Sequence, residues 1–467
     1  MSEQSSDQSG VQSTEPISPL TKALSEYIAG TADRALPPAV AEKTRHHVLD
    51  TIAAIVSGSR LRAGRLATGY VSRLAGVPEA LVIGTSFLVP AEFAALANAM
   101  SGHADETDDS HLGGRFHPGC GIVPAALAVA ELKECSGAQF VRAVALGYDI
   151  GARLNMSMGY SEPNNRPGHS THSLGTAFGA AAAAAALLRF DARQVRHVLS
   201  YAGQQASGVP YWHRDSEHVE KAFDFGGMGA RNGVAGALMV AAGCTGIEDP
   251  FTGRNNFYTA FGEKPAPEEL TRGLGTRFEI MEATIKKWCV GSPIQAVLDA
   301  STALAAEHRM RPDDIKAIRI TMPDDRMHIV DNRSSPDLCV QHLASIAIVD
   351  GTVSFEATHD HSRMNDKTIR AVRSRITMIP SPELTKAVPA RQAIVEIDLA
   401  SGATVRHHAK AVRGTPDNPM TTQEIEGKAH DLVLPIIGPE RARKLVEAVR
   451  NIDKLRSLRE LRVLLLA

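Results

Sequence analysis

Residues 175–188 read GTAFGAAAAAAALL, and this alanine-rich stretch is the feature that decides the fold class. Alanine has the highest helix propensity of all residues, so the stretch predicts a helix. A helix that is apolar on every side is buried, and its small side chains let neighbouring helices approach closely. Because the stretch is shorter than the roughly 18 apolar residues that a membrane span requires, we expect it inside a globular helical bundle.

Helical periodicity extends outward from this stretch in both directions. Apolar residues recur three and four positions apart, as on the buried face of an amphipathic helix. The predicted helices are residues 36–57, 90–100, 123–132, 140–154, 192–206, 229–242, 422–433, 439–451 and 455–466. We therefore predict a mainly α fold in which both chain ends, residues 18–273 and 414–467, form one large helical domain.

A different pattern interrupts the helical texture. Residues 315–322 (IKAIRITM) alternate apolar and polar side chains, which predicts a half-buried strand, and residues 393–411 read as a β-hairpin. Predicted helices at 292–307 and 341–350 lie between them. This mixture predicts a smaller α+β lid domain, residues 274–413, inserted between the two parts of the helical domain.

Composition argues against several classes of function. The formal net charge is −2 and aromatic residues make up 5%, so no nucleic-acid partner is expected. The five cysteines have no CxxC spacing, which indicates reduced thiols rather than a disulfide framework or a zinc ribbon. Residues 1–17 are polar and lack the apolar core of a signal peptide, so we expect a disordered tail. The expected location is cytoplasmic, with no membrane partner.

The densest group of titratable side chains lies just before a predicted apolar helix. Residues 101–119 read SGHADETDDSHLGGRFHPG and contain His103, His111 and His117. Catalysis needs acids and bases at the edge of an apolar environment, so this density indicates an active site. The acidic members are Asp105, Glu106, Asp108 and Asp109.

Further polar clusters flank other predicted helices. They are residues 168–175 (GHSTHSLG), 220–231 (EKAFDFGGMGAR), 285–289 (IKKWC) and 337–342 (DLCVQH). Lysines in such positions would bind carboxylates, and a histidine or a carboxylate would move a proton on carbon. The glycine-rich turn at 226–229 does not follow a predicted strand, so it fails the context of a dinucleotide site. His359-Asp360-His361 has metal-like spacing without an evident third ligand, so no metal is expected.

The same residues resemble the motifs of the MmgE/PrpD family, which includes 2-methylcitrate dehydratases, cis-aconitate decarboxylases and an iminodisuccinate epimerase. The family pattern H-A-L-D-Y-D-D-T-H, followed by H-P-G or H-P-S, is similar to residues 103–111 (HADETDDSH) and 117–119 (HPG). The resemblance extends from about Thr21 to the last predicted helices. The other similar motifs, in chain order, are residues 169–171 (HST), Lys221, residues 285–289 (IKKWC) and residues 339–342 (CVQH).

The resemblance implies a large helical domain, a smaller α+β lid and an active site in the cleft between them. It also implies a homodimer and no metal or organic cofactor. Position by position, it places the family's site carboxylate at Glu106, where aspartate is usual, and its threonine at Ser110. The other implied site residues are His117, His169, Lys221 and Lys286. Residues 329–331 (IVD) hold no clear counterpart of the lid tyrosine of the decarboxylases.

We therefore predict a cofactor-independent lyase, similar to 2-methylcitrate dehydratase, that acts on a small di- or tricarboxylate substrate. The predicted catalytic residues are Glu106, His117, His169 and Lys221, and the predicted substrate-binding residues are Ser110, Lys286 and Arg231. We expect Asp105, Asp108 and His103 to be structural, with Asp105 and Asp108 as caps or surface groups. The alternatives are an epimerase or racemase of an imino- or amino-dicarboxylate, a cis-aconitate-type decarboxylase and a non-catalytic binding protein.

Overall fold

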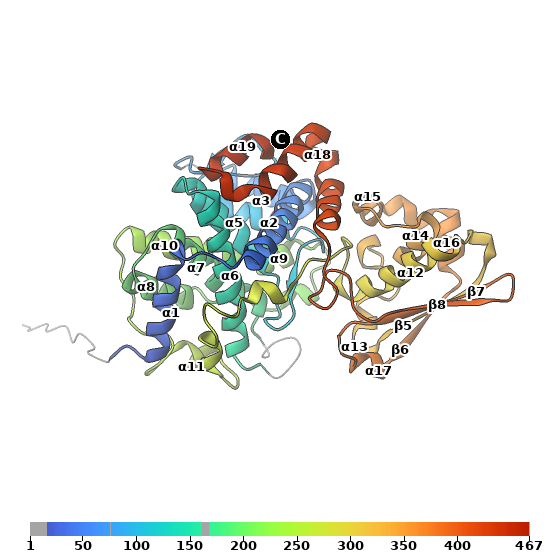
Figure 1. Ribbon diagram of the computed structural model, residues 1–467, viewed down its shortest axis with the longest axis horizontal. Coiled ribbons are helices and arrows are strands. Elements are labelled where there is room, and N and C mark those ends of the chain that lie inside the picture. Colours follow the sequence, from blue (N-terminus) through green and yellow to red (C-terminus); the bar gives the residue numbers. More distant parts are fainter. Residues whose placement is uncertain (1–15, 75, 161–167, 467) are drawn as a thin grey trace, which may run out of the picture.

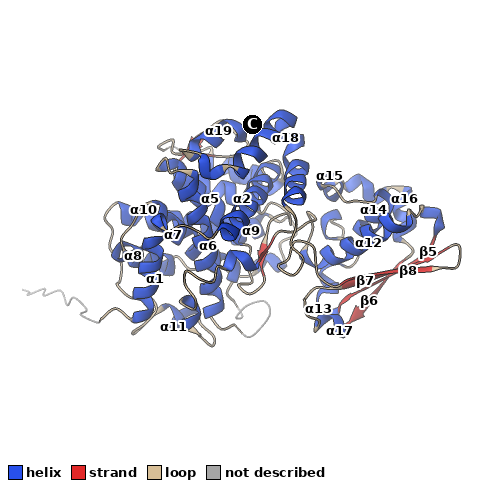
Figure 2. Ribbon diagram, in the orientation of Figure 1, coloured by secondary structure: helices blue, strands red, loops and turns tan. Residues whose placement is uncertain are grey.

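The computed structural model describes residues 16–74, 76–160 and 168–466. Within this part of the chain, helices dominate, and a four-stranded sheet lies with several helices to one side of the larger helical body (Figure 2). The predicted mainly α fold class is therefore confirmed. Most of the predicted disordered tail, up to residue 15, lies outside the described residues.

The alanine-rich stretch forms most of helix α7 (Thr171–Leu187), which is buried along almost its whole length. It packs against α5 (Pro118–Leu132), α6 (Gly137–Ser157) and α10 (Met228–Ala241). A Cβ atom added to Gly179 would lie 2.6 Å from the carbonyl oxygen of Gly147, so only glycine permits this approach of α7 to α6. The small residues of the stretch thus place it in the core of the helical part, as predicted.

The remaining helices before residue 270 surround this centre. Each helix predicted in this region is observed, although α5 and α7 begin about one turn earlier than predicted, whereas α1, α3, α9 and α11 were not predicted. The predicted glycine-rich turn between Lys221 and Arg231 is wrong, because one π-helical turn (Phe223–Gly227) joins α9 to α10 without a break. The surrounding helices are α1 (Pro19–Ala29), α2 (Pro38–Gly58), α3 (Arg62–Val71), α4 (Ala91–Gly102), α8 (Ala192–Gln204), α9 (Val219–Ala222) and α11 (Phe257–Phe261).

The C-terminal segment returns to the first helices. Helix α18 (Thr422–Arg450) packs along α2. It bends at Gly438, which has a φ of 76° and precedes a proline. The last predicted helix is reduced to 3-10 turns and the short α19 (Arg462–Leu465). Buried apolar residues between 24 and 289 and between 420 and 465 form one cluster, so the two ends share a core. Figure 1 shows the blue and red segments in the same larger body.

A second apolar cluster, drawn from residues 288–412, belongs to what we call the α+β part. Its sheet has the order β6-β5-β7-β8, in which β6 is parallel to β5 and the other pairs are antiparallel. Helices α12, α14 and α16 lie beside the sheet (Figure 1). The strands are β5 (Ile315–Pro323), β6 (Ile376–Ser381), β7 (Ala393–Leu399) and β8 (Thr404–Ala409). The helices are α12 (Gln295–His308), α13 (Asp324–Val330), α14 (Val340–Asp350), α15 (Phe355–His359), α16 (Lys367–Arg373) and α17 (Pro382–Thr385).

Strand β6 was not predicted, because it is an edge strand only six residues long that contains a proline. The strand at 315–322 and the hairpin at 393–411 are confirmed as β5 and as β7 with β8. The proposed domain boundaries, and the role of the α+β part as a lid, stay predictions.

Two short strand pairs complete the fold. Strand β1 (Ala80–Leu81) pairs with β2 (Leu88–Val89). Strand β3 (Ser110–His111) pairs antiparallel with β4 (Ala283–Thr284), so the titratable loop is fixed to the segment that leads into the α+β part. No helix among the described residues combines the length and the apolar character of a membrane span.

A buried ion pair fixes α18 to the first helices. Lys428 Nζ lies 2.6 Å from Asp50 Oδ1 of α2, and the two side chains are 5% and 1% exposed. Lys428 also donates to the Thr107 carbonyl oxygen at 3.0 Å. Burial raises the pKa of Asp50 to about 6 although Lys428 opposes that shift. The ionised form of Asp50 is therefore stabilised by the ammonium group of Lys428.

We expect Lys428→Ala to lower the free energy of unfolding by about 3–5 kcal/mol, because it leaves a buried carboxylate without a cation. Lys444→Ala is the matched control on the same helix, since its pair with Glu440 is exposed and contributes at most about 1 kcal/mol. Denaturant unfolding followed by circular dichroism measures both. Equal losses in the two variants would contradict the assigned role of Lys428.

Candidate functional site

The loop between α4 and α5 carries the titratable side chains, and every residue from 103 to 111 is buried. A buried loop needs partners for its backbone polar groups. Lys286 Nζ donates to the Glu106 carbonyl oxygen at 2.8 Å, and Lys428 binds the next carbonyl, that of Thr107. Two lysines from distant parts of the chain thus hold the loop that presents Glu106.

The Glu106 carboxylate lies among cationic and imidazole groups. Lys221 of α9 forms an ion pair with its Oε1 atom, and Lys286 Nζ lies 3.8 Å from Oε2. His218 Nδ1 is 4.0 Å from Oε1, and the left-handed backbone of His218 (φ 57°) begins α9 at this point. Burial raises the pKa of Glu106, but Lys221 and Lys286 outweigh it and hold that pKa well below its usual range. Glu106 is therefore ionised.

Asp108 joins two histidines. His103 Nδ1 lies 2.9 Å from Oδ2 and His117 Nδ1 lies 3.0 Å from Oδ1, while Lys286 Nζ is 3.6 Å from Oδ1. Burial raises the pKa of Asp108, but its contacts with His103, His117 and Lys286 outweigh burial and hold that pKa well below its usual range. Because an ionised carboxylate only accepts hydrogen bonds, His117 donates from Nδ1, and in its neutral form its Nε2 keeps a lone pair.

Phe225, in the π-helical turn, forms the apolar wall of the site. The ring of His172 stacks on it with a centroid distance of 3.5 Å, and the ring of His117 lies 5.2 Å from it. Lys221 Nζ is 5.1 Å from the Phe225 centroid, which is within the range of a cation–π contact. Trp212 lies edge-on to His172 at 5.6 Å.

Three histidines of this cluster are neutral at physiological pH. Burial lowers the pKa of His117 to about 4, against the opposing effect of Asp108. Burial and Lys221 lower the pKa of His218 to about 3. The pKa of His172 is also well below its usual range, because of burial and the neighbouring histidines. The site therefore combines ionised carboxylates and lysines with imidazoles that can accept a proton.

Asp109 supports the start of α5 behind this cluster. Its carboxylate accepts hydrogen bonds from the Gly119 backbone N–H at 2.8 Å and from the Tyr148 hydroxyl at 2.6 Å. His47 Nδ1 lies 2.7 Å from it. Because His117 is the residue just before α5, these bonds fix the backbone that carries His117.

Among the described residues, His103, Asp108 and His117 have ligand atoms close enough together to hold a metal ion. The same atoms already form a hydrogen-bonded group, and the ammonium group of Lys286 lies 3.6 Å from Asp108. This positive charge opposes a second cation at that point. The arrangement therefore fits a proton-transfer group better than a metal centre.

Four of the predicted site residues, Glu106, His117, Lys221 and Lys286, converge on this cluster. Ser110 is buried on β3, and its backbone pairs with Thr284. The centroid of the His169 ring lies 5.2 Å from that of Phe261 in α11.

Arg231 contacts Asn232, and its guanidinium lies 5.9 Å from the Phe223 ring. Those partners of Arg231 are not members of the cluster.

The structure adds four residues that were not predicted for the site, namely His103, Asp108, His172 and His218. The expectation that Asp108 is a cap or surface group is wrong, because Asp108 is fully buried and joins two histidines. His172 stands three residues after His169 in the same motif, and the early start of α7 puts it inside the helix. The motif at residues 168–175 indicated that a histidine belongs to the site. Whether His169 or His172 reaches the cluster depends on where α7 begins, which the sequence did not predict correctly.

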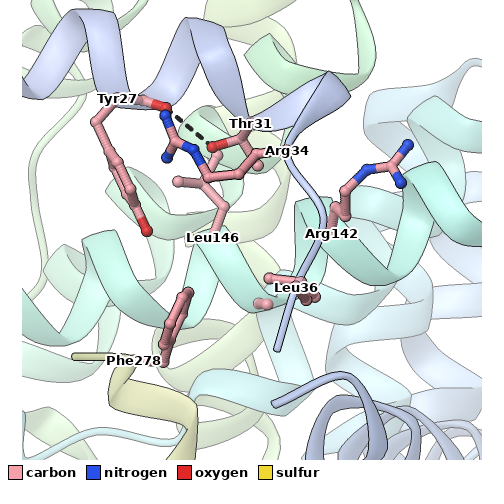
Figure 3. Close-up of a pocket in the computed structure, with 8 residues that line it drawn as sticks. Tyr27, Thr31, Arg34, Leu36, Arg142, Leu146 and Phe278 are labelled. Atoms are coloured by element: carbon pink, nitrogen blue, oxygen red, sulfur yellow. Dashed lines mark hydrogen bonds between the residues drawn. The ribbon is translucent and has the colours of Figure 1, made fainter. Parts of the chain in front are cut away.

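A groove of about 880 Å³ lies between α18 and the α+β part. Cys289 and Lys428 line it, and Lys428 binds the loop carbonyl of Thr107. By contrast, the cavity in Figure 3 has a volume of about 10 Å³, room for about one water molecule. The residues that line it include Tyr27, Arg34 and Arg142, and none of them is a predicted site residue.

Comparison with known proteins identifies two domains of one family. The MmgE/PrpD N-terminal domain matches residues 22–270, and the MmgE/PrpD C-terminal domain matches residues 288–454. A cis-aconitate decarboxylase-like protein, oryM, from Aspergillus oryzae is 25% identical over 97% of this chain and 99% of its own length. Two cis-aconitate decarboxylases from Aspergillus terreus are each 25% identical over 60% of this chain and 59% of their own length.

The two domain matches cover most of the chain and agree with the motifs that the buried cluster contains. They extend from the first helix of the helical part to α18. The chain therefore belongs to the MmgE/PrpD family.

Proposed function

We propose that this protein is a cofactor-independent lyase that acts on a small di- or tricarboxylate by moving a proton on a carbon next to a carboxylate. The observation that carries the proposal is the buried cluster in which Lys221 and Lys286 face Glu106 and Asp108 beside neutral histidines. Such a set can bind an acid, stabilise developing negative charge and accept a proton.

The lysines are the proposed binding groups for the substrate. Lys221 retains 14% exposure of its side chain, whereas Lys286 retains 1%. We assign the first contact with a substrate carboxylate to Lys221. Lys286, held between Glu106 and Asp108, stabilises the negative charge that develops when the proton leaves.

His117 is the proposed base, because Asp108 binds its Nδ1 and leaves Nε2 free to accept a proton. His172 stands 5.5 Å from it, measured between ring centroids, and is the second candidate for the same step. Glu106, ionised beside Lys221, supplies a further proton acceptor. The prediction that His169 acts as the base remains a prediction.

We propose dehydration as the reaction, because a neutral imidazole can take a proton from substrate carbon. The electron pair left on that carbon forms the double bond as the β-hydroxyl, protonated by a second acid, leaves as water. A second candidate, decarboxylation, is favoured by the names of the similar proteins from Aspergillus. In that reaction a carbon–carbon bond breaks, carbon dioxide leaves, and the residual carbanion takes up a proton. The site then needs a proton donor rather than a proton acceptor.

We expect purified protein to convert 2-methylcitrate or a related hydroxy acid into an unsaturated acid, which is followed by ultraviolet absorbance. Carbon dioxide released from cis-aconitate would identify decarboxylation instead. Deuterium that enters recovered substrate without elimination would identify an epimerase. If none of these acids is bound or turned over, the proposed function is wrong.

We expect Lys221→Ala and His117→Asn to reduce kcat/KM by roughly 10²–10⁴-fold, which is the usual contribution of a positioned acid or base. Lys22→Ala is the control, because this lysine side chain is 65% exposed and its ion pair is with Glu26, one helical turn away. Circular dichroism checks that each variant is folded. Unchanged turnover in both site variants would remove these residues from the mechanism.

The pH profile provides a separate prediction. A base must be neutral, and burial lowers the pKa of His117 to about 4. We therefore expect kcat/KM to stay level as the pH falls through 6.5 and to decline only as the pH approaches about 4, provided that the protein remains folded. An acidic limb near the ordinary histidine pKa of about 6.5 would contradict this assignment.

A further inference from the structure

His359, at the end of α15 in the α+β part, contacts the loop of the candidate site. Its Nε2 atom lies 3.1 Å from Asp105 Oδ2, and the two side chains are 23% and 7% exposed. At the other end of the same short helix, the Phe355 N–H donates to Asp431 of α18 at 2.7 Å. Both ends of α15 are therefore attached to the helical part, and Figure 1 shows α15 on the side of the α+β part that faces α18.

The contacts of His359, a hydrogen bond at Nδ1 and an ion pair at Nε2, fit a positively charged imidazole. Its Nδ1 atom lies 2.9 Å from the Phe355 carbonyl oxygen, which can only accept, so Nδ1 donates. Nε2 then faces the Asp105 carboxylate, and Asp337 of the α+β part adds a second negative charge. Burial lowers the pKa of His359, but Asp105 and Asp337 outweigh it and raise that pKa to about 9.

Asp105 also organises the backbone around Glu106. Its Oδ1 accepts a hydrogen bond from the Thr107 N–H at 2.8 Å, and its Oδ2 accepts one from the Thr107 hydroxyl at 2.8 Å. Glu106 is the residue enclosed by this turn, and its carboxylate pairs with Lys221. The contact of His359 with Asp105 therefore acts on the turn that aims Glu106.

The neighbouring residues of the His359-Asp360-His361 motif have other roles. Asp360 accepts from the Ser362 N–H and hydroxyl, at 2.8 and 2.6 Å, and His361 is exposed. Of these three residues, His359 is the one that contacts the loop of residues 103–111. The motif is thus explained by one interdomain ion pair and a local turn.

We propose that His359 is a positioning residue: its ion pair with Asp105 holds the turn that presents Glu106 and couples that turn to the seating of the α+β part on the helical part. The inference rests on the proposed function only for its activity measurement. The charged or titratable groups that face the pair are Asp337 beside His359, and His218 and Cys289 near Asp105.

Hydrogen–deuterium exchange of the full chain tests the contact without any substrate. We expect His359→Gln to speed exchange in residues 104–108 and in α15 by roughly tenfold, because a largely buried ion pair is lost. His361→Gln is the matched control and should leave both segments unchanged. Asp105→Asn should reproduce the effect, and the double variant should add little to either single change.

Turnover provides the second measurement. We expect His359→Gln to reduce kcat more than it raises KM, and to remove an alkaline limb near pH 9 that the unsubstituted protein shows. The activity falls on the alkaline side because the pKa of His359 is raised to about 9. The stabilisation by the ion pair is complete below the pKa of free histidine and is lost as the pH rises through about 9.

The outcomes separate the two proposals. Exchange in His359→Gln equal to that in His361→Gln would overturn the positioning role, and so would altered exchange with normal kcat and an unchanged pH profile. Altered exchange in a protein that turns over none of the acids would refute the proposed function while the contact stands. If His359→Gln does not fold, Asp105→Asn, compared with Asp366→Asn on the exposed face of the α+β part, supplies the same test.

Discussion

The rest of the site depends on one buried ammonium group. Lys286 retains 1% exposure of its side chain, and its Nζ atom contacts the Glu106 carbonyl oxygen, the Glu106 carboxylate and the Asp108 carboxylate. A buried cation is costly unless opposite charges and hydrogen bonds surround it. The acids of the loop provide that environment, and the lysine in turn keeps them ionised. This reciprocal dependence explains why so many charges can lie beneath an apolar helix.

The charge balance of the cluster bears on the proposed chemistry. Lys221 and Lys286 face two ionised carboxylates, while His117, His172 and His218 are neutral. Under the proposed function, a substrate carboxylate that approaches Lys221 would compete with Glu106 for the same ammonium group.

Sequence patterns predicted the frame of the molecule well. Local propensity and apolar periodicity identified α2, α4, α6 and α7, and the change of period identified β5. They failed at β6, a short edge strand with a proline, and at the π-helical turn that contains Phe225. Both elements are stabilised by partners distant in the chain, which no local pattern records.

The site was predictable only in part, for a similar reason. Motif resemblance identified Glu106, His117, Lys221 and Lys286, which the fold brings together. It did not distinguish His172 from His169, because the start of α7 decides which residue lies in its first turn. It also could not pair Asp105 with His359, since 254 residues separate them and only the seating of the α+β part makes them neighbours.

The amino-acid sequence by itself determined a mainly helical chain with an alanine-rich central helix, a small mixed α+β segment and a loop dense in acids and histidines. These properties follow from side-chain size, periodicity and composition, which act within a few residues of one another. Tertiary structure alone decided which charges meet, which histidines become neutral and which part of the chain holds Glu106 in place. Those properties depend on burial and on distances of about 3–4 Å between groups far apart in the chain, where Coulomb energy and desolvation are large.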